Sequence, residues 1–181
     1  MTSGHFRTTP ERIVGKSKAD PGPDWVIKVG GSLGARPAAL RRLMATLGRA
    51  ARRRRLLVVP GGGSFADEIR RADRRFGLGD SAAHWMAILA MDQYGHLLAR
   101  LTPGAALVRH PRGVKPGRLN ILLPSSWLVD ADPLPHSWDV TSDSIAAWVA
   151  RATRAGLVMA MRNDSMARSI RPISRYAMAR S

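Results

Sequence analysis

"VIKVGGS", residues 26–32, decides the fold: a β-branched apolar run carries one lysine, Lys28, and then breaks at two glycines. A short apolar run bounded by glycines is typical of a buried strand. A second run, "LLVVP" at residues 56–60, is followed in the same way by "GGGS". Residues 36–55, between the two, carry leucines and a methionine at helical spacing. Strand, helix and strand within about 35 residues predict a βαβ unit, and therefore a parallel sheet covered on both faces.

The rest of the chain continues this alternation. An amphipathic helix is predicted at residues 64–77, a long helix at 80–101 with Asp80 or Ser81 as cap, and a further helix at 141–153 with Thr141 at or near the N-cap. Strands are predicted at residues 105–110, 119–124 and 156–161, the first two flanking a Gly/Pro loop at 111–117. We therefore expect an α/β fold, a three-layer α/β/α sandwich with a mainly parallel sheet, at residues 24–161. Residues 1–23 are predicted to be a flexible leader and residues 162–181 a basic tail.

Composition excludes several classes of protein. The chain has 181 residues, 45 % of them hydrophobic, and no cysteine, which rules out disulfides and thiolate metal sites and fits a cytoplasmic location. No apolar run approaches the roughly 18 residues of a membrane span. The net charge of +16 comes mainly from arginines, which are scattered over several predicted helices without a nucleic-acid motif. We attribute them to the codon bias of a GC-rich genome. We expect neither nucleic acid nor membrane as a partner; a nucleic-acid-binding module would show affinity that falls steeply with salt.

The two glycine breaks are candidate anion sites. Glycine after a strand lets backbone N–H groups face a ligand, and a following helix N-terminus adds positive potential. In a parallel sheet both breaks lie at the same edge, so they are neighbours if their strands are adjacent. Lys28 lies two residues before Gly30 and can reach over that edge. Two phosphate sites with a lysine between them indicate phosphoryl transfer. The alternative is that Lys28 extends to solvent from an edge strand and the glycines form ordinary turns.

Three segments, "VIKVGGS", "VVPGGGSFADEIR" and "WDVTSDSIAAWVA", together resemble the amino acid kinase superfamily, which includes acetylglutamate, uridylate and isopentenyl phosphate kinases. The segments "RRFGLGDSAAHWMAILAMDQYG" and "LLPSSWL…DPLPHSWDVTSDSIA" resemble one branch more closely. Its members phosphorylate (5-(aminomethyl)furan-3-yl)methyl phosphate to the diphosphate in methanofuran and methylofuran biosynthesis. The resemblance covers about residues 24–158 and implies an ATP-dependent kinase whose acceptor is a phosphomonoester.

The resemblance also implies a role for each matching residue. Lys28 would hold the transferring phosphoryl group, and Asp143 would orient the lysine. The ATP phosphates would contact Gly30, Gly31 and Ser32, and the acceptor's phosphate would contact Gly61, Gly62 and Gly63. Asp139 lies four residues before Asp143, where relatives carry a polar active-site residue. The sequence itself leaves open that Asp139 and Asp143 only cap the helix that begins near them.

The long helix at residues 80–101 offers further candidates. Asp92 and His84 are unusual on an apolar helix, because burying a charge without a partner is costly. Asp92 would suit an aminomethyl cation on the substrate, although a structural role or an oligomer contact is the more frequent use of such a residue. His84 has the same two explanations, and His136, just before "WDVTSD", is slightly better placed. Because this helix looks apolar and exposed at residues 81–99, we expect a homo-oligomer.

Two features bear on the cofactors. No His or carboxylate cluster suggests a metal site, so Mg²⁺ is expected to arrive on the ATP phosphates. Family members continue beyond the strand at residues 157–161 and usually carry a second lysine at its end, whereas this chain has Arg162 and no lysine after Lys115. The nucleotide lobe therefore looks shortened or divergent. This leaves an active kinase, favoured by Lys28 and the glycine loops, and a kinase-like binding protein that has lost productive ATP binding.

Overall fold

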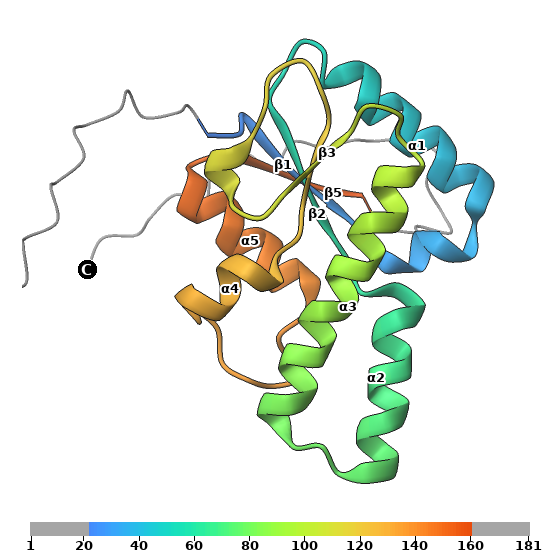
Figure 1. Ribbon diagram of the computed structural model, residues 1–181, viewed down its shortest axis with the longest axis vertical. Coiled ribbons are helices and arrows are strands. Elements are labelled where there is room, and N and C mark those ends of the chain that lie inside the picture. Colours follow the sequence, from blue (N-terminus) through green and yellow to red (C-terminus); the bar gives the residue numbers. More distant parts are fainter. Residues whose placement is uncertain (1–21, 161–181) are drawn as a thin grey trace, which may run out of the picture.

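The computed structural model describes residues 22–160 (Figure 1). The predicted tail at 162–181, with Arg162, and all but the end of the predicted leader lie outside the described residues.

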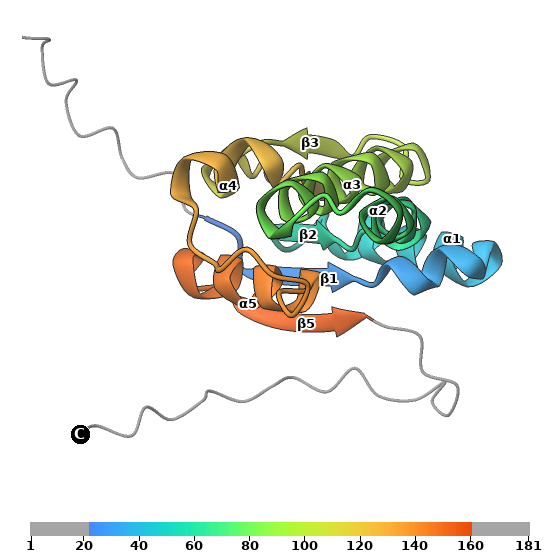
Figure 2. The ribbon, with the colours of Figure 1, turned by 90° about the horizontal axis from the view of Figure 1, so that it is seen from below.

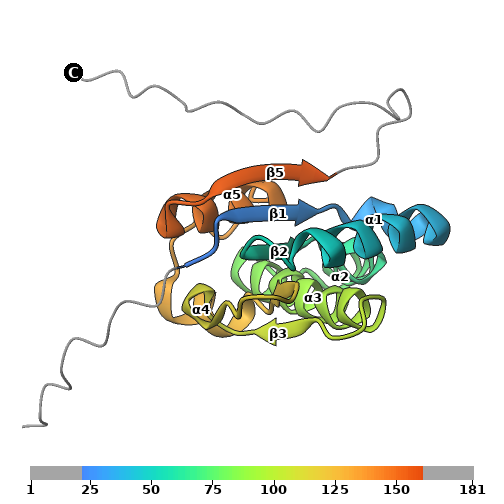
Figure 3. The ribbon, with the colours of Figure 1, turned by 90° about the horizontal axis from the view of Figure 1, so that it is seen from above.

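One parallel five-stranded sheet forms the centre of the fold, in the order β3-β4-β2-β1-β5. Figures 2 and 3 show β3, β2, β1 and β5 following one another in this order, from two opposite sides. The strands are β1 (Trp25–Val29), β2 (Leu56–Pro60), β3 (Ala106–Val108), β4 (Asn120–Leu122) and β5 (Gly156–Ala160). The predicted α/β fold with a parallel sheet is confirmed. Because β1 pairs with both β2 and β5, the alternative in which Lys28 extends from an edge strand is wrong.

The helices also follow the predicted pattern. They are α1 (Pro37–Ala50), α2 (Gly63–Phe76), α3 (Asp80–Arg100), α4 (Ser125–Ala131) and α5 (Ser142–Thr153), with short 3-10 helices at Gly31–Ala35 and Pro111–Gly113. Thr141 is the N-cap of α5, as predicted, and its hydroxyl accepts a hydrogen bond from the Asp143 N–H. The predicted cap of α3 is wrong: Gly79 is the N-cap, in a conformation with φ of 77° that favours glycine, and Asp80 is the first helical residue. Helix α4 was not predicted.

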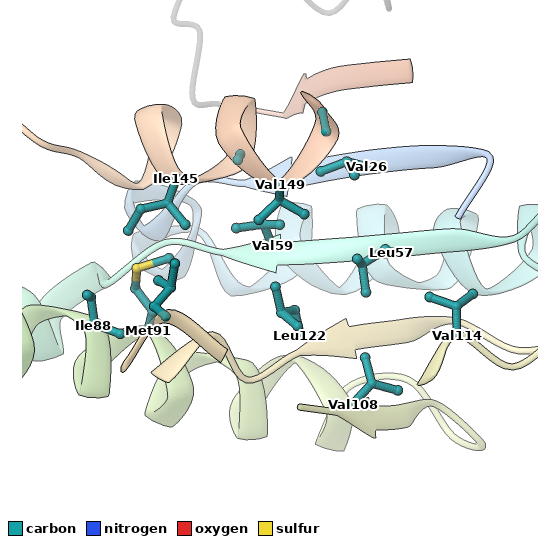
Figure 4. Packing of buried hydrophobic residues seen from close by; sticks show 13 residues of the cluster. Val26, Leu57, Val59, Ile88, Met91, Val108, Val114, Leu122, Ile145 and Val149 are labelled. Atoms are coloured by element: carbon teal, nitrogen blue, oxygen red, sulfur yellow. The ribbon is translucent and has the colours of Figure 1, made fainter. Parts of the chain in front are cut away.

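Two apolar clusters hold helices to the opposite faces of the sheet, because successive strand residues point to opposite sides. Val26, Leu57 and Val59 pack with α5 and α4 on one face. Figure 4 shows Ile145 and Val149 of α5 beside Val26 and Val59. On the other face Ile27 and Val58 pack with α1. Helix α3 contributes residues to both clusters. Lys28 alternates with Ile27 along β1, so it lies on the α5 face.

Helices α2 and α3 carry the fold beyond the carboxyl ends of the strands. Figure 1 shows α2 and the first half of α3 extending together from that edge of the sheet. Helix α3 is less exposed than its sequence suggested: eight of its residues are buried, and Leu89 and Leu97 are its exposed large hydrophobic side chains. The reason given for expecting a homo-oligomer is therefore weak, and the oligomer stays a prediction. Within residues 22–160, none of the helices has the length and apolar character needed to cross a membrane.

Candidate active site

Lys28 and Asp143 form an ion pair at the carboxyl end of the sheet. The Lys28 Nζ lies 2.6 Å from the Asp143 Oδ1, and the lysine is only 6 % exposed. Asp143 comes from the first turn of α5, which packs on the face where Lys28 projects. The Asp143 Oδ1 that faces the Lys28 ammonium is itself buried. The pair explains how a cation is accommodated inside a buried strand: its charge is matched by a carboxylate.

The two glycine loops touch each other beside this pair. A Cβ on Gly31 would lie 2.1 Å from the backbone N of Gly63, and one on Gly61 would lie 2.5 Å from the N of Gly31. Gly63 also has a φ of 57°, which disfavours any other residue. The predicted proximity of the loops is thus confirmed. One detail differs: the first loop leads into the 3-10 helix at Gly31–Ala35, so only the second loop opens directly into an α-helix.

A hollow with about 1140 Å³ of empty space opens over these loops, and we call it the lysine hollow. It is lined by Lys28, Gly30, Gly31, Ser32, Gly34, Ala35, Gly62, Gly63, Ser64, Phe65, Asp67, Tyr94, Leu97 and Ser142. The structure thereby brings Lys28, the predicted ATP-phosphate residues and two of the three predicted acceptor glycines to one place. Gly61, the third, is buried beneath them, where its N–H donates to the Val29 carbonyl.

A second hollow, which we call the tryptophan hollow, adjoins the first at Gly62 and Ser142. It has about 550 Å³ of empty space. Its lining is Gly62, Ala66, Arg70, His84, Ala87, Ile88, Met91, Ser137, Trp138, Val140, Thr141, Ser142 and Ile145. The wall therefore combines apolar residues and one indole with the hydroxyl residues Ser137, Thr141 and Ser142. Two adjoining hollows, one of them lined by Lys28 and both glycine loops, can hold a phosphate donor and an acceptor side by side.

His84 projects into the tryptophan hollow and is 8 % exposed. Its ring stacks on that of His136, with centroids 4.5 Å apart and planes 19° from parallel. Burial lowers the pKa of His84, and the neighbouring His136 lowers it further, while Asp132 opposes the change. His136 is held by Asp132, 3.0 Å from its Nε2, and by the Ser81 hydroxyl, 2.8 Å from its Nδ1. A neutral imidazole therefore faces the hollow at pH 7.

This lowered pKa predicts a loss of stability in mild acid. In the unfolded chain His84 has an ordinary pKa of about 6.5, whereas in the folded chain its pKa is lower, so the folded chain binds a proton there less readily. The contribution of neutral His84 to the free energy of unfolding is thus complete above about pH 6.5 and is lost as the pH falls below that value. Urea unfolding at pH 7 and pH 5 measures the effect. The difference in unfolding free energy between the two pH values should be smaller in His84→Gln than in the wild type, and unchanged in the exposed control His96→Gln.

Asp92 and Asp139 are not brought into either hollow. Asp92 accepts hydrogen bonds from the Ser125 hydroxyl and from the Ser125 N–H, the latter at 3.3 Å, and so holds the start of α4. Burial raises its pKa, although the bonds from Ser125 oppose the shift. Asp92 therefore has the structural role that its sequence left open beside a substrate role. Asp139 is exposed on the loop before α5, where its N–H donates to the Ser137 hydroxyl at 3.1 Å. The substrate roles of both residues remain predictions without geometric support.

Sequence reasoning missed two residues of the tryptophan hollow, Arg70 and Trp138. Arg70 belongs to the arginines that we attributed to composition, and a single arginine on an amphipathic helix carries no signal of its own. Trp138 is the first residue of the "WDVTSD" motif, between His136 and Asp139. A large aromatic residue in a polar loop was the signal that could have identified it. Only the packing of α2 against the loop before α5 shows that the two side chains meet.

The site fits the phosphates of a nucleotide better than a resident metal. The backbone at Gly31 leaves no room for a Cβ, Gly63 has a φ of 57° that disfavours one, and Lys28 supplies positive charge beside both loops. Among the residues that the structure describes, no group of three or more His, Asp or Glu side chains could hold a metal ion. Mg²⁺ would therefore be carried on the phosphate oxygens with most of its waters.

Comparisons with known proteins agree with this arrangement. A profile described as "Amino acid kinase family" matches residues 25–165. The [5-(aminomethyl)furan-3-yl]methyl phosphate kinase of Methanocaldococcus jannaschii is 30 % identical over 129 residues, which cover 70 % of this chain and 59 % of that protein. The crystal structure of uridylate kinase from Archaeoglobus fulgidus superposes with a TM-score of 0.60 at 21 % identity, over 78 % of this chain and 64 % of that one.

This chain thus spans less than two thirds of either relative. The match to the family, however, extends over the whole sheet, both glycine loops and the Lys28–Asp143 pair. The chain belongs to the amino acid kinase family.

Proposed function

We propose that this protein is a small-molecule kinase that transfers a phosphoryl group from ATP to a phosphomonoester and so forms a diphosphate. The observation that carries the proposal is the position of Lys28: buried, paired with Asp143, and lining the lysine hollow together with the two contacting glycine loops. Phosphoryl transfer depends mainly on positioning and on charge stabilisation of the transferring oxygens. A fixed ammonium group between two sets of backbone N–H donors supplies both.

In this mechanism the residues act as follows. Gly30, Gly31 and Ser32 bind the donor phosphates, and Gly62 and Gly63, at the start of α2, bind the acceptor's phosphate. An oxygen of that phosphate attacks the γ-phosphorus, the bond from the γ-phosphorus to the bridging oxygen breaks, and ADP leaves. Because the attacking oxygen is already ionised at neutral pH, no general base is required. Mg²⁺ would neutralise charge on the phosphate oxygens.

Within this mechanism Lys28 and Asp143 have separate tasks. Lys28 stabilises the negative charge on the oxygens of the transferring group, and it holds its proton throughout. Asp143 is a positioning residue: it holds the Lys28 ammonium at the lysine hollow and compensates its burial.

For the acceptor we propose (5-(aminomethyl)furan-3-yl)methyl phosphate, in a methylofuran or methanofuran type of C1-carrier synthesis. Support comes from the activity for which the relative in M. jannaschii is named and from the Trp138 indole in the wall of the tryptophan hollow. Trp138 and the stacked His84 offer flat surfaces for a small ring.

A direct test is phosphorus NMR of the full chain with Mg-ATP and this furan phosphate, beside the same furan alcohol without phosphate. We expect diphosphate and ADP to form in equal amounts from the phosphate and no product from the alcohol. ATP binding without product from any phosphomonoester would contradict the proposal. It would favour the alternative, a kinase-like binding protein that does not catalyse transfer.

A further inference from the structure

The tryptophan hollow has an uneven charge. Of the thirteen described residues that line it, Arg70 is the one with a permanent charge, and no Asp or Glu is among them. His84 faces the same space as a neutral ring. A ligand in this hollow therefore meets the Arg70 guanidinium on one side, and apolar residues, the Trp138 indole and the hydroxyl residues Ser137, Thr141 and Ser142 on the others.

Arg70 is held in place by an aromatic platform. Its guanidinium carbon lies 4.9 Å from the centre of the Trp138 ring. The Trp138 Nε1–H donates to Asp73 Oδ2 at 2.7 Å, and the other oxygen of Asp73 accepts the Leu78 N–H at 3.0 Å. The ring is thus fixed to the end of α2, the helix that also carries Arg70. This arrangement limits the positions that the guanidinium can take before a ligand arrives.

Most of the hydrogen-bonding capacity of Arg70 remains available. One nitrogen, Nη1, lies 3.2 Å from Asp67 Oδ1, in a pair whose side chains are 46 % and 58 % exposed. A guanidinium has five N–H donors in a planar fork that matches phosphate geometry. Asp67 lines the lysine hollow and lies one turn into α2 from Gly63, so the guanidinium is held near the junction of the two hollows.

We infer that Arg70 binds the anionic group of the acceptor and selects phosphate esters of small flat rings, which Trp138 receives by stacking. This inference rests on the proposed function and adds a specificity-determining residue to it. The acceptor class follows from the lining of the hollow. The Arg70 guanidinium calls for an anionic group on the ligand, and the Trp138 indole suits a flat ring. A cationic ligand without a phosphate finds no carboxylate in the described lining and should be excluded.

The neighbouring Arg71 provides a matched control. It lies on the same helix, pairs with Glu68, is exposed, and lines neither hollow. Arg70→Gln and Arg71→Gln remove the same charge from adjacent positions, so any general effect of lowering the net charge is shared. Arg70→Lys keeps the charge but removes the planar fork.

The experiment is calorimetric titration of each protein, without ATP, with benzyl phosphate as the probe and with benzyl alcohol and benzylamine as comparisons. We expect binding of benzyl phosphate to weaken at least about tenfold in Arg70→Gln, as loss of a charge-assisted hydrogen bond predicts, and less in Arg70→Lys. Arg71→Gln should bind like the wild type, and neither comparison ligand should bind. Circular dichroism and thermal unfolding check that each variant is folded.

Several results would overturn the inference: no binding of benzyl phosphate to the wild type, equal binding in folded Arg70→Gln, or an equal loss in Arg71→Gln. If Arg70→Gln fails to fold, Arg70→Lys decides, because unchanged affinity in that variant would exclude a role for the fork. Because the titration contains no ATP, its outcome is independent of transfer. A chain that binds benzyl phosphate through Arg70 but transfers nothing would refute the proposed kinase while leaving this inference intact.

Discussion

Replacement of Lys28 by alanine is expected to lower the rate of phosphoryl transfer at least about 100-fold, the usual effect of removing one group that stabilises transition-state charge. The variant should still fold. The Asp143 side chain is 42 % exposed, so water can reach its carboxylate when the lysine is gone. We expect the free energy of unfolding to fall by about 1–3 kcal/mol, the cost of leaving a partly buried polar group without its partner.

The rate is measured by ADP release coupled to diphosphate formation, with circular dichroism as the check on folding. Lys115→Ala is the control, because Lys115 is exposed and lines neither of the two hollows. Asp143→Ala should also slow transfer, and the double variant should be no slower than Lys28→Ala if Asp143 acts through the lysine. Transfer at the wild-type rate in folded Lys28→Ala would contradict the mechanism.

Replacement of Gly31 by alanine is expected to separate the two glycine loops. The new Cβ would lie 2.1 Å from the Gly63 N and 2.4 Å from the Gly63 Cα, and both are backbone atoms that no rotamer change can move. We expect the free energy of unfolding to fall by about 1–3 kcal/mol, as in other overpacked sites. The dissociation constant for Mg-ATP should rise at least about tenfold, because the N–H groups that bind the phosphates are displaced.

Gly113→Ala is the matched control for this variant. A Cβ there would meet only Val108, at an ordinary contact distance of 3.7 Å, and the residue lies outside both hollows. Its stability and ATP affinity should be close to those of the wild type. Urea unfolding and calorimetry measure the two quantities in both variants. Wild-type affinity for Mg-ATP in Gly31→Ala would show that the first loop does not bind the donor phosphates.

The central part of the fold could be predicted from sequence because it depends on local patterns. Short apolar runs, one of them carrying Lys28, predicted β1 and β2, and glycines directly after them marked the edge of a parallel sheet where ligands bind. The same reasoning placed Lys28 beside both loops. The partner of Lys28 was reached only through the resemblance of "TSDS" to the family motif, since nothing local indicates that Asp143 lies 2.6 Å from a lysine 115 positions earlier in the sequence.

The failures concern contacts between segments far apart in the chain. Helix α4 has only seven residues, too short for a helical period to be recognised, and its start is held by Asp92 from α3. The same contact explains why Asp92, an unusual residue on an apolar helix, has a structural partner. Arg70 and Trp138 meet only because the loop before α5 packs on α2. In each case the side chain's role depends on a tertiary neighbour that periodicity does not reveal.

The most direct test is calorimetric titration of Mg-ATP into the full chain, with Lys28→Ala titrated in parallel. We predict binding to the wild type that is at least about tenfold weaker in the variant, because a charge-assisted contact to the donor phosphates is lost. Binding of that kind would place the nucleotide in the lysine hollow. A folded wild type that gives no heat at millimolar Mg-ATP, or binding that is unaffected by loss of Lys28, would contradict a kinase site built on this lysine.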